Sequence, residues 1–272
     1  MSSGAGRTSG LTADELAAYR RDGQVTPDFR LDDALLADMR EAAEALVAAR
    51  SDIRPEFVPL PHVPWDGSDK ARVLARRFLA FARSPEILDL VESVIGPDIV
   101  FWTAALFSKP GGDGRPVPWH QDGIYWPLKP MSTVTVWVAL DDADVENGCM
   151  RIIPGSHRQG FLTHHKSDAD GLVLNTTIVE AELSPEKARC VELKAGQVSL
   201  HDAYLVHGSE PNVSARRRAG LTLRYMPGTS LYEREQPMES GSNTVPLEFA
   251  ERPIWLVRGV DRAGNDFRRG HR

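Results

Sequence analysis

The chain has 272 residues, 42% of them hydrophobic, so it is long enough to bury the core of one large domain or two small ones. Its formal net charge of −6, with no basic stripe, argues against a nucleic-acid partner. Only two cysteines occur, Cys149 and Cys190, so we expect no disulfide framework and predict a cytoplasmic location. The sequence contains no apolar run of membrane-spanning length and no signal-peptide core, so we expect no membrane partner.

We expect a single domain over residues 11–272, preceded by a small, polar and disordered tail over residues 1–10. The domain divides by pattern into a helical N-terminal part at 11–97, a β-rich core at 98–228 and a C-terminal extension at 229–272. The sequence indicates no role for the extension.

Three helix starts are predicted in the first third of the chain. Thr12 begins a capping box, and a second helix should follow Asp32 or Asp33, where apolar residues recur at helical spacing. Ser84 precedes a proline at the first helical position, and this third helix should end at Gly96.

A proline-rich segment over residues 51–69 is predicted to be a long loop between these helices. It could be a simple linker or a segment that covers a substrate, since long ordered loops often serve binding. The sequence favours neither interpretation.

From Asp98 onward the pattern changes to short, β-branched segments bounded by Gly, Pro or Asp. Five of them are predicted to be strands, at residues 99–102, 133–138, 150–153, 197–200 and 220–225. Because helices do not alternate regularly with these segments, they favour an antiparallel sandwich or barrel.

The most informative motif is His120-Gln121-Asp122. In an extended segment, residues 120 and 122 direct their side chains to one face, so both can bind one metal ion. A third ligand must come from elsewhere, and His207 is the candidate. Two histidines and one carboxylate form the open site of non-haem Fe(II) oxygenases, which leaves coordination positions free for chemistry.

Two alternatives weaken this interpretation when each motif is taken alone. A His-x-Asp triplet is common by chance, and a lone histidine is more often a packed or surface residue. His201 lies six residues before His207 and would share its face in an unbroken strand, so it competes for the position of third ligand.

Arg218 lies eleven residues after His207. A guanidinium can bind a carboxylate through two parallel hydrogen bonds, so an arginine near an open iron site suits a dicarboxylate co-substrate. Arg216 and Arg217 adjoin it, and alternation places Arg216 on the same face as Arg218 and Arg217 on the opposite face.

This combination resembles the phytanoyl-CoA dioxygenase family of Fe(II)- and 2-oxoglutarate-dependent oxygenases. The family pattern is His-x-Asp, then a distal His followed by Gly-Ser, with Asn at +5, Ser at +7 and Arg at +11, and it is met here by Asn212, Ser214 and Arg218. Other matching segments are residues 84–91, 96–99, 135–142, 147–150 and 154–157. The resemblance covers roughly residues 11 to 228.

The resemblance implies a mainly β fold with flanking helices, the double-stranded β-helix, which is a cupin-like jelly roll. It implies His120, Asp122 and His207 as catalytic Fe(II) ligands, in preference to His201. For 2-oxoglutarate it implies Arg218 at the distal carboxylate with Ser209 as its hydroxyl partner. Trp137 and Lys109 match positions that line the co-substrate pocket in the family, although Trp137 could equally be a core aromatic.

Asp122 bears on the reaction. Related halogenating enzymes carry a small residue at this position, which leaves room for a halide, so the carboxylate here favours hydroxylation or another oxidation. Around the motif, Tyr125 and Trp126 could line a substrate pocket, whereas alternation turns Trp119 away from the ligands. Arg224 could bind a substrate carboxylate or form an ordinary ion pair.

The predicted function is therefore oxidation of a small molecule by O2, with 2-oxoglutarate converted to succinate and CO2. Phytanoyl-CoA itself is not implied; a natural-product intermediate or an amino-acid derivative is the expected substrate class. The alternatives are a cupin-type isomerase or hydrolase that uses the metal without Arg218, and a small-molecule-binding protein with a relic metal site. The oligomeric state is not predicted.

Overall fold

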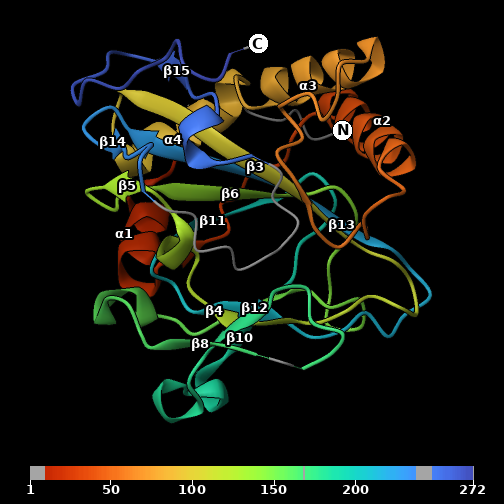
Figure 1. Cartoon of the computed structure of the whole chain (residues 1–272). Coiled ribbons are helices and arrows are strands. Elements are labelled where there is room, and N and C mark those ends of the chain that lie inside the picture. Colours follow the sequence, from red (N-terminus) through yellow and green to blue (C-terminus); the bar gives the residue numbers. More distant parts are fainter. Residues whose placement is uncertain (1–9, 168, 237–246, 272) are drawn as a thin grey trace, which may run out of the picture.

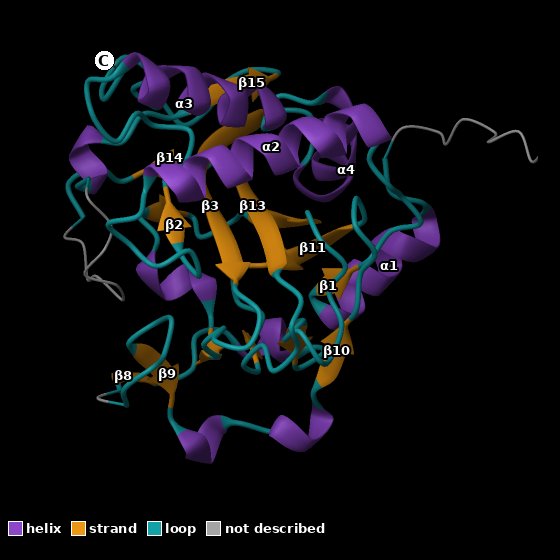
Figure 2. Cartoon of the chain, turned by 90° about the vertical axis from the view of Figure 1, so that its right-hand side faces the viewer, coloured by secondary structure: helices purple, strands orange, loops and turns teal. Residues whose placement is uncertain are grey.

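The computed structural model describes residues 10–167, 169–236 and 247–271. Nearly all of the predicted N-terminal tail therefore lies outside the described residues. Two antiparallel sheets face each other, and helices cover the outer face of the larger sheet (Figures 1 and 2). The predicted mainly β architecture with helices outside it is confirmed.

The N-terminal helices begin where their capping residues predict. Helix α1 (Ala13–Asp22) has the capping box of Thr12 and Glu15, and α2 (Asp33–Ala49) is capped by Asp32. Helix α4 (Pro85–Ile95) starts at its proline, although its N-cap side chain makes no capping hydrogen bond. A further helix, α3 (Asp69–Phe81), follows the proline-rich segment and was not singled out from the sequence.

The larger sheet has seven strands, and all of its pairings are antiparallel. Its main path runs β1 (Gln24–Val25), β11 (Val198–Asp202), β6 (Val134–Ala139), β13 (Arg218–Pro227), β3 (Ile99–Lys109) and β15 (Trp255–Arg258). The short strand β2 (Val58–Pro59) also pairs with β3. The predicted strands at 99–102, 133–138, 197–200 and 220–225 all belong to this sheet.

The smaller sheet has four strands in the order β10 (Arg189–Val191), β7 (Met150–Ile152), β12 (His207–Ser209) and β4 (Val117–His120). Two-stranded ribbons pair β14 (Leu231–Tyr232) with β5 (Leu128–Lys129), and β8 (His164–Lys166) with β9 (Thr176–Ile178). Short 3₁₀ turns complete the connections: η1 (Asp122–Tyr125), η2 (Ser156–Gln159), η3 (Glu180–Glu182), η4 (Pro185–Lys187) and η5 (Phe249–Glu251).

The two faces of the larger sheet differ in chemistry because side chains alternate along each strand. On β6 and β13, the residues Val136, Val138, Leu221 and Leu223 belong to the main hydrophobic core, together with residues of α2, α3 and α4. Burying each such side chain contributes about 1.5–3 kcal/mol. The alternate residues of the same strands, such as Thr222, face the smaller sheet, where the site lies.

The proline-rich segment is fixed to the larger sheet through β2, which argues against a free linker. Glu56, 1% exposed, pairs with Arg54 at 2.7 Å and Arg115 at 3.3 Å, so its burial is compensated. The C-terminal extension contributes β14 and the edge strand β15. Among the described residues, no helix combines the length and the apolar character needed to cross a membrane.

Candidate active site

His120, Asp122 and His207 form a buried group between the two sheets. One ligand atom from each residue lies within 4.8 Å of the others, a spacing that allows all three to bind one ion. The strands β4 and β12 bring the two histidines together, because His120 and His207 are register partners with ring centroids 4.2 Å apart. Asp122 follows directly, since Gln121 is extended (φ −118°, ψ 129°) and so places residues 120 and 122 on one side.

Both histidines present the same nitrogen to this group. The Nδ1 of His120 lies 2.9 Å from the carbonyl oxygen of Pro118, and the Nδ1 of His207 lies 2.9 Å from that of Leu205. Each Nδ1 therefore donates its proton to a carbonyl, which leaves the Nε2 lone pair for a metal, as in ligating histidines generally. Two imidazoles and a carboxylate are a donor set that suits Fe(II).

The charge states also suit metal binding. Burial, with His120 nearby, holds the pKa of His207 well below its usual value, so the ring is neutral. Burial acts to raise the pKa of Asp122, but Arg224 above all, then His120 and His201, hold it well below the usual range. Asp122 is therefore an anion.

Gln121 was not identified from the sequence, although it separates two of the ligands. It is fully buried on the opposite side of the strand, where its Nε2 donates to the carbonyls of Gly160 (2.8 Å) and Tyr204 (2.7 Å). Its Oε1 accepts from the backbone N–H of Leu162 at 2.8 Å. These three bonds fix the backbone from which His120 and Asp122 project.

His201 lies beside the group and not within it. It belongs to β11 of the larger sheet, whereas His207 belongs to β12 of the smaller one, so the unbroken strand considered in the sequence is not formed. The two rings still approach to 4.9 Å between centroids, and the Nε2 of His201 lies 3.6 Å from the Oδ2 of Asp122.

Arg218 occupies one end of the same cavity. It is 4% exposed, its Nε donates to the carbonyl of Gly148 at 3.2 Å, and its guanidinium lies 5.6 Å from the ring centre of Trp137. Burial lowers the pKa of Arg218 to about 10, so it remains a cation at neutral pH. Its terminal nitrogens form no hydrogen bond within the described part of the chain, so a ligand can take them.

Lys109 and Ser209 join Arg218 at this end. Lys109 is the register partner of Arg218, and its Nζ donates to the Oγ of Ser209 at 2.8 Å and to the carbonyl of Glu210. Burial, and then the charge of Arg218, lower the pKa of Lys109 to about 6. The structure therefore brings together the residues that the sequence assigned to the co-substrate.

Trp137 lies flat against a glycine. On β13, Gly220 lies two residues before Thr222, the register partner of Trp137, and a Cβ at Gly220 would be 2.0 Å from the Cζ2 of the indole. Trp137 also packs in a second hydrophobic cluster with Ala139 and Met150. The indole is therefore packed in a hydrophobic cluster and also lines the cavity.

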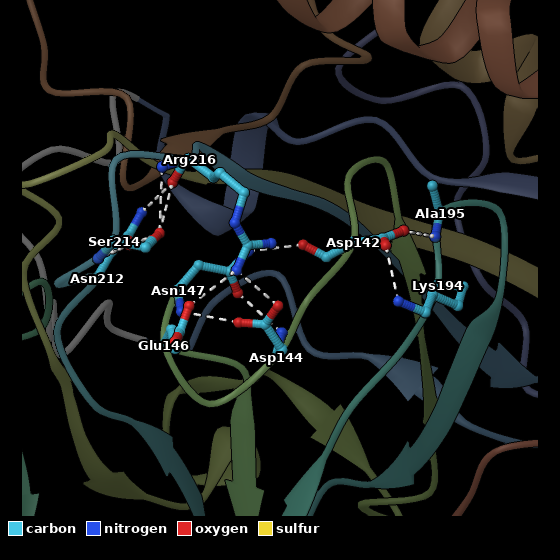
Figure 3. Close-up of polar contacts among 9 residues, drawn as sticks. All are labelled: Asp142, Asp144, Glu146, Asn147, Lys194, Ala195, Asn212, Ser214 and Arg216. Atoms are coloured by element: carbon cyan, nitrogen blue, oxygen red, sulfur yellow. Dashed lines mark hydrogen bonds and ion pairs between the residues drawn. The ribbon is translucent and has the colours of Figure 1, made fainter.

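The loop that carries Gly148 is held by its own polar side chains (Figure 3). Asp144 and Asn147 exchange side chain–backbone bonds of 2.8 and 3.1 Å, and the Nδ2 of Asn147 donates to the carbonyl of Asp142 at 2.7 Å. Gly148 itself has φ 74°, and a Cβ there would be 2.5 Å from the carbonyl oxygen of Glu210. The carbonyl that Arg218 needs is thus placed by a turn that favours glycine.

A second turn supports the start of β13 and the end of β3. The Nδ2 of Asn212 donates to the carbonyls of Pro110 at 2.9 Å and Arg216 at 2.6 Å. Figure 3 shows Asn212 and Arg216 side by side in this turn. Arg216 pairs with Asp144 at 2.8 Å near the surface, and Arg217 pairs with Asp141 at 2.8 Å. Of the three adjacent arginines, only Arg218 reaches the cavity, because β13 begins at residue 218.

Arg224 lies at the other end, beyond the metal group. It is 7% exposed, its Nη1 donates to the Oγ1 of Thr222 at 3.0 Å, and its guanidinium lies 5.1 Å from the ring centre of Trp126. Its Nη2 is 3.7 Å from the Oδ2 of Asp122. Trp119 instead carries Arg151 over its ring at 5.2 Å and does not line the cavity.

One cavity thus connects both ends with the metal group. It is lined by Phe107, Val117, His120, Asp122, Trp137, Met150, His201, His207, Gly208, Ser209, Arg218, Thr222 and Arg224. An open metal site with a buried arginine at each end can hold a metal, an anionic co-substrate and a further small molecule.

Comparison with known proteins places this site in a family. The sequence matches the family described as phytanoyl-CoA dioxygenase (PhyH) over residues 19–220. A probable alpha-ketoglutarate-dependent hypophosphite dioxygenase of Stutzerimonas stutzeri is 28% identical over 215 residues, which cover 75% of this chain and 71% of that protein. An ectoine dioxygenase of Bordetella parapertussis is 25% identical over 273 residues, which cover 92% of this chain and 86% of that one.

Solved structures agree. The apo form of ThoJ, a non-heme monooxygenase, is 28% identical with a TM-score of 0.68, and the match covers 91% of this chain and 85% of that one. The epimerase SnoN, at 24% identity and a TM-score of 0.65, supports the fold alone. The double-stranded β-helix, the dioxygenase class and the dependence on iron and 2-oxoglutarate are confirmed at the level of the family. The chain belongs to the phytanoyl-CoA dioxygenase family.

Proposed function

We propose that this protein hydroxylates an unactivated C–H bond of a small molecule, with His120, Asp122 and His207 as the iron ligands. The observation that carries this proposal is the joint placement of an open His–Asp–His group and a buried arginine in one cavity. An isomerase or hydrolase would use the metal group but would not need a site that binds a dicarboxylate.

The ligand residues hold Fe(II) through the two Nε2 atoms and one oxygen of Asp122, and their backbone carbonyl partners keep the imidazoles in the required tautomer. Bound iron and 2-oxoglutarate supply the oxidation, in which O2 delivers one oxygen atom to succinate and one to the substrate, with release of CO2. The burial of the group excludes bulk water from the reacting atoms.

Arg218 binds the distal carboxylate of 2-oxoglutarate through its terminal nitrogens, which the described residues leave unused. Ser209 adds a hydroxyl to the same carboxylate, and Lys109 orients that hydroxyl through its 2.8 Å bond. Trp137 forms a wall of the same pocket and restrains the guanidinium through its ring.

Hydroxylation is favoured over halogenation because Asp122 fills the position that a halide would need. For the substrate, the relatives give no single answer, since one is named for hypophosphite and another for ectoine. We infer a natural-product intermediate or an amino-acid derivative as the class. Both cysteines are free thiols, which fits action in the reducing cytoplasm.

The test is succinate formation by the Fe(II)-loaded protein from 2-oxoglutarate and O2, with and without candidate substrates. We expect metal-dependent succinate that rises with substrate, and a product heavier by one oxygen atom whose mass is insensitive to added chloride. Substrate conversion without 2-oxoglutarate would favour an isomerase or hydrolase. Metal binding with no turnover of 2-oxoglutarate would favour a binding protein.

A further inference from the structure

At the end of the cavity away from Arg218, several buried polar atoms have no hydrogen-bond partner within the described residues. Besides the Oδ2 of Asp122, which belongs to the metal group, they include the Nε of Arg224, both ring nitrogens of His201 and the Oγ1 of Thr135. Leaving a buried polar group unsatisfied costs about 1–3 kcal/mol. Four such atoms in one place therefore point to a ligand that supplies the missing partners.

These three residues form one row across the larger sheet. Thr135 on β6 is the register partner of His201 on β11 and of Arg224 on β13. Directly opposite residues of adjacent strands share a face and have Cβ atoms about 4.5–5.5 Å apart. His201 and Arg224 line the cavity, so this face of the row is turned towards the metal group.

The guanidinium of Arg224 is already oriented. Thr222 holds its Nη1 at 3.0 Å, and Trp126 covers its face at 5.1 Å. The opposite edge, formed by Nε and Nη2, remains available. Asp122 approaches Nη2 only to 3.7 Å and leaves Nε without a partner. An arginine presents two parallel N–H groups along such an edge, which is the geometry that a carboxylate matches.

The molecule bound at Arg218 cannot also reach Arg224. Both residues lie on the cavity side of β13, six positions apart in unbroken register with β3, which corresponds to about 20 Å between their Cα atoms. A five-carbon diacid that is anchored at Arg218 by one end and bound at the metal group by the other has no group left for Arg224. The two arginines therefore serve different ligands.

The charges favour an anion at the second end. With iron and 2-oxoglutarate bound, the positive charges are those of Fe(II) and the two buried arginines, and the negative charges are those of the diacid and Asp122. Their sum leaves one positive charge uncompensated. An uncompensated buried charge is costly. A monoanion compensates it, whereas a dianion such as phosphate would overcompensate it.

On the basis of the proposed function, we propose that Arg224, His201 and Thr135 form a substrate-anchoring site that binds a carboxylate of a small monoanionic substrate. Arg224 receives both oxygens on its Nε–Nη2 edge, and His201 and Thr135 satisfy the remaining lone pairs. The rest of the substrate then extends towards the metal group.

Equilibrium binding tests this without turnover. The probes are propionate, hexanoate and benzoate, each paired with its neutral amide, and inorganic phosphate. They are titrated by calorimetry into protein loaded with Fe(II) and saturating 2-oxoglutarate in the absence of oxygen, so that the Arg218 end is filled. We compare the native protein with Arg224→Gln, Arg224→Lys and the control Arg76→Gln, which removes an exposed charge on α3.

We expect at least one acid to bind at least tenfold more tightly than its amide and than phosphate. Arg224→Gln should weaken that acid at least tenfold, while Arg76→Gln should leave it unchanged. Arg224→Lys keeps the charge but loses the two parallel N–H groups, so it should weaken binding of that acid severalfold. If Arg224→Gln does not fold, this weakening in Arg224→Lys tests the proposal in its place.

Three results would overturn the proposal: acids that bind no better than amides or phosphate, affinities unchanged in the Arg224 variants, or no binding of any acid. If Arg224→Gln weakens Fe(II) binding but not acid binding, Arg224 serves Asp122 alone and the proposal is likewise wrong. Failure of the native protein to bind Fe(II) and 2-oxoglutarate at all would instead contradict the proposed function.

Discussion

Each end of the cavity carries a buried arginine, but the two arginines and their neighbours differ in how far they are hydrogen-bonded. At the first end, the Nε of Arg218 is bonded to the carbonyl of Gly148, and its neighbour Lys109 is bonded to Ser209. At the second end, Arg224 and His201 keep nitrogens without partners in the described part of the chain. The first end is therefore prepared for one fixed ligand, whereas the second is completed only when a ligand binds.

This difference separates what the family requires from what the individual enzyme selects. Under the proposed function, the site for the co-substrate is supported by backbone turns and a glycine–tryptophan contact. The proposed substrate site is instead a row of side chains with free hydrogen-bonding capacity.

Removing a ligand should abolish function at both ends at once. We expect His120→Ala, Asp122→Ala or His207→Ala to lose Fe(II) binding and to lower turnover by at least about a thousandfold, since the metal carries the chemistry. Metal affinity by calorimetry and succinate release measure the two effects. His201→Ala is the matched control and should retain Fe(II) binding. The reverse pattern, with loss in His201→Ala and retention in His207→Ala, would refute the ligand assignment.

Removing Arg218 should affect only the first end. We expect Arg218→Ala to weaken 2-oxoglutarate binding by about 2–5 kcal/mol, because a buried charge-assisted contact is lost, and to leave Fe(II) binding largely intact. Arg218→Lys should rescue this in part at most, because the fork is lost. Arg216→Ala, which removes a pair near the surface with Asp144, should not change the KM for 2-oxoglutarate. An unchanged KM in Arg218→Ala would point to a different co-substrate site.

A methyl group at Gly220 should disturb the same end through Trp137. The added Cβ would lie 2.0 Å from the indole, so Gly220→Ala must displace the ring from Arg218. Overpacking of this kind typically costs about 1–3 kcal/mol of stability. Urea unfolding measures that loss, and a 2-oxoglutarate titration should show weaker binding. Equal affinity for 2-oxoglutarate at reduced stability would mean that Trp137 is a core residue only.

Lys109 should make the stability of the ligand-free protein depend on pH. Its pKa is about 6 when folded, against an ordinary value of 10.5, so between these values the unfolded chain binds one more proton. The free energy of unfolding should therefore rise with pH across this window, by about 1.4 kcal/mol per pH unit from this residue, and this contribution should be flat below pH 6. In Lys109→Met, urea unfolding at several pH values should show a smaller slope. An identical slope would show that Lys109 is charged in the folded protein.

The metal group and the Arg218 end could be predicted largely from the sequence, because their signals are local or belong to the family pattern. His120 and Asp122 face the same side, as their spacing predicts, because Gln121 between them is extended. The spacing from His207 identified Arg218, whereas alternation alone would have left Arg216 open. Alternation fails there because Arg216 precedes the strand.

At the second end the sequence suggested only Arg224, which could bind a substrate carboxylate or form an ion pair. The rest could not be predicted, because it depends on register between strands far apart in sequence. Nothing local indicates that Thr135 lies between His201 and Arg224, or that the chain passes from one sheet to the other between residues 202 and 207. The anchoring of Gln121 has the same origin, since its partners come from the segment 160–162 and from Tyr204. The sequence offered one indication of this role: Gln121 lies between two ligands, so alternation directs its side chain to the opposite side of the strand.

A crystal structure of the protein with Fe(II) and 2-oxoglutarate, prepared without oxygen, would show directly which residues bind the metal and the co-substrate. We predict one metal ion bound by the Nε2 atoms of His120 and His207 and by Asp122, with the distal carboxylate of 2-oxoglutarate on Arg218 and the Arg224 end left for a second molecule. A metal ion bound by His201 in place of His207, or a 2-oxoglutarate carboxylate on Arg224, would contradict the division of the cavity into two ends.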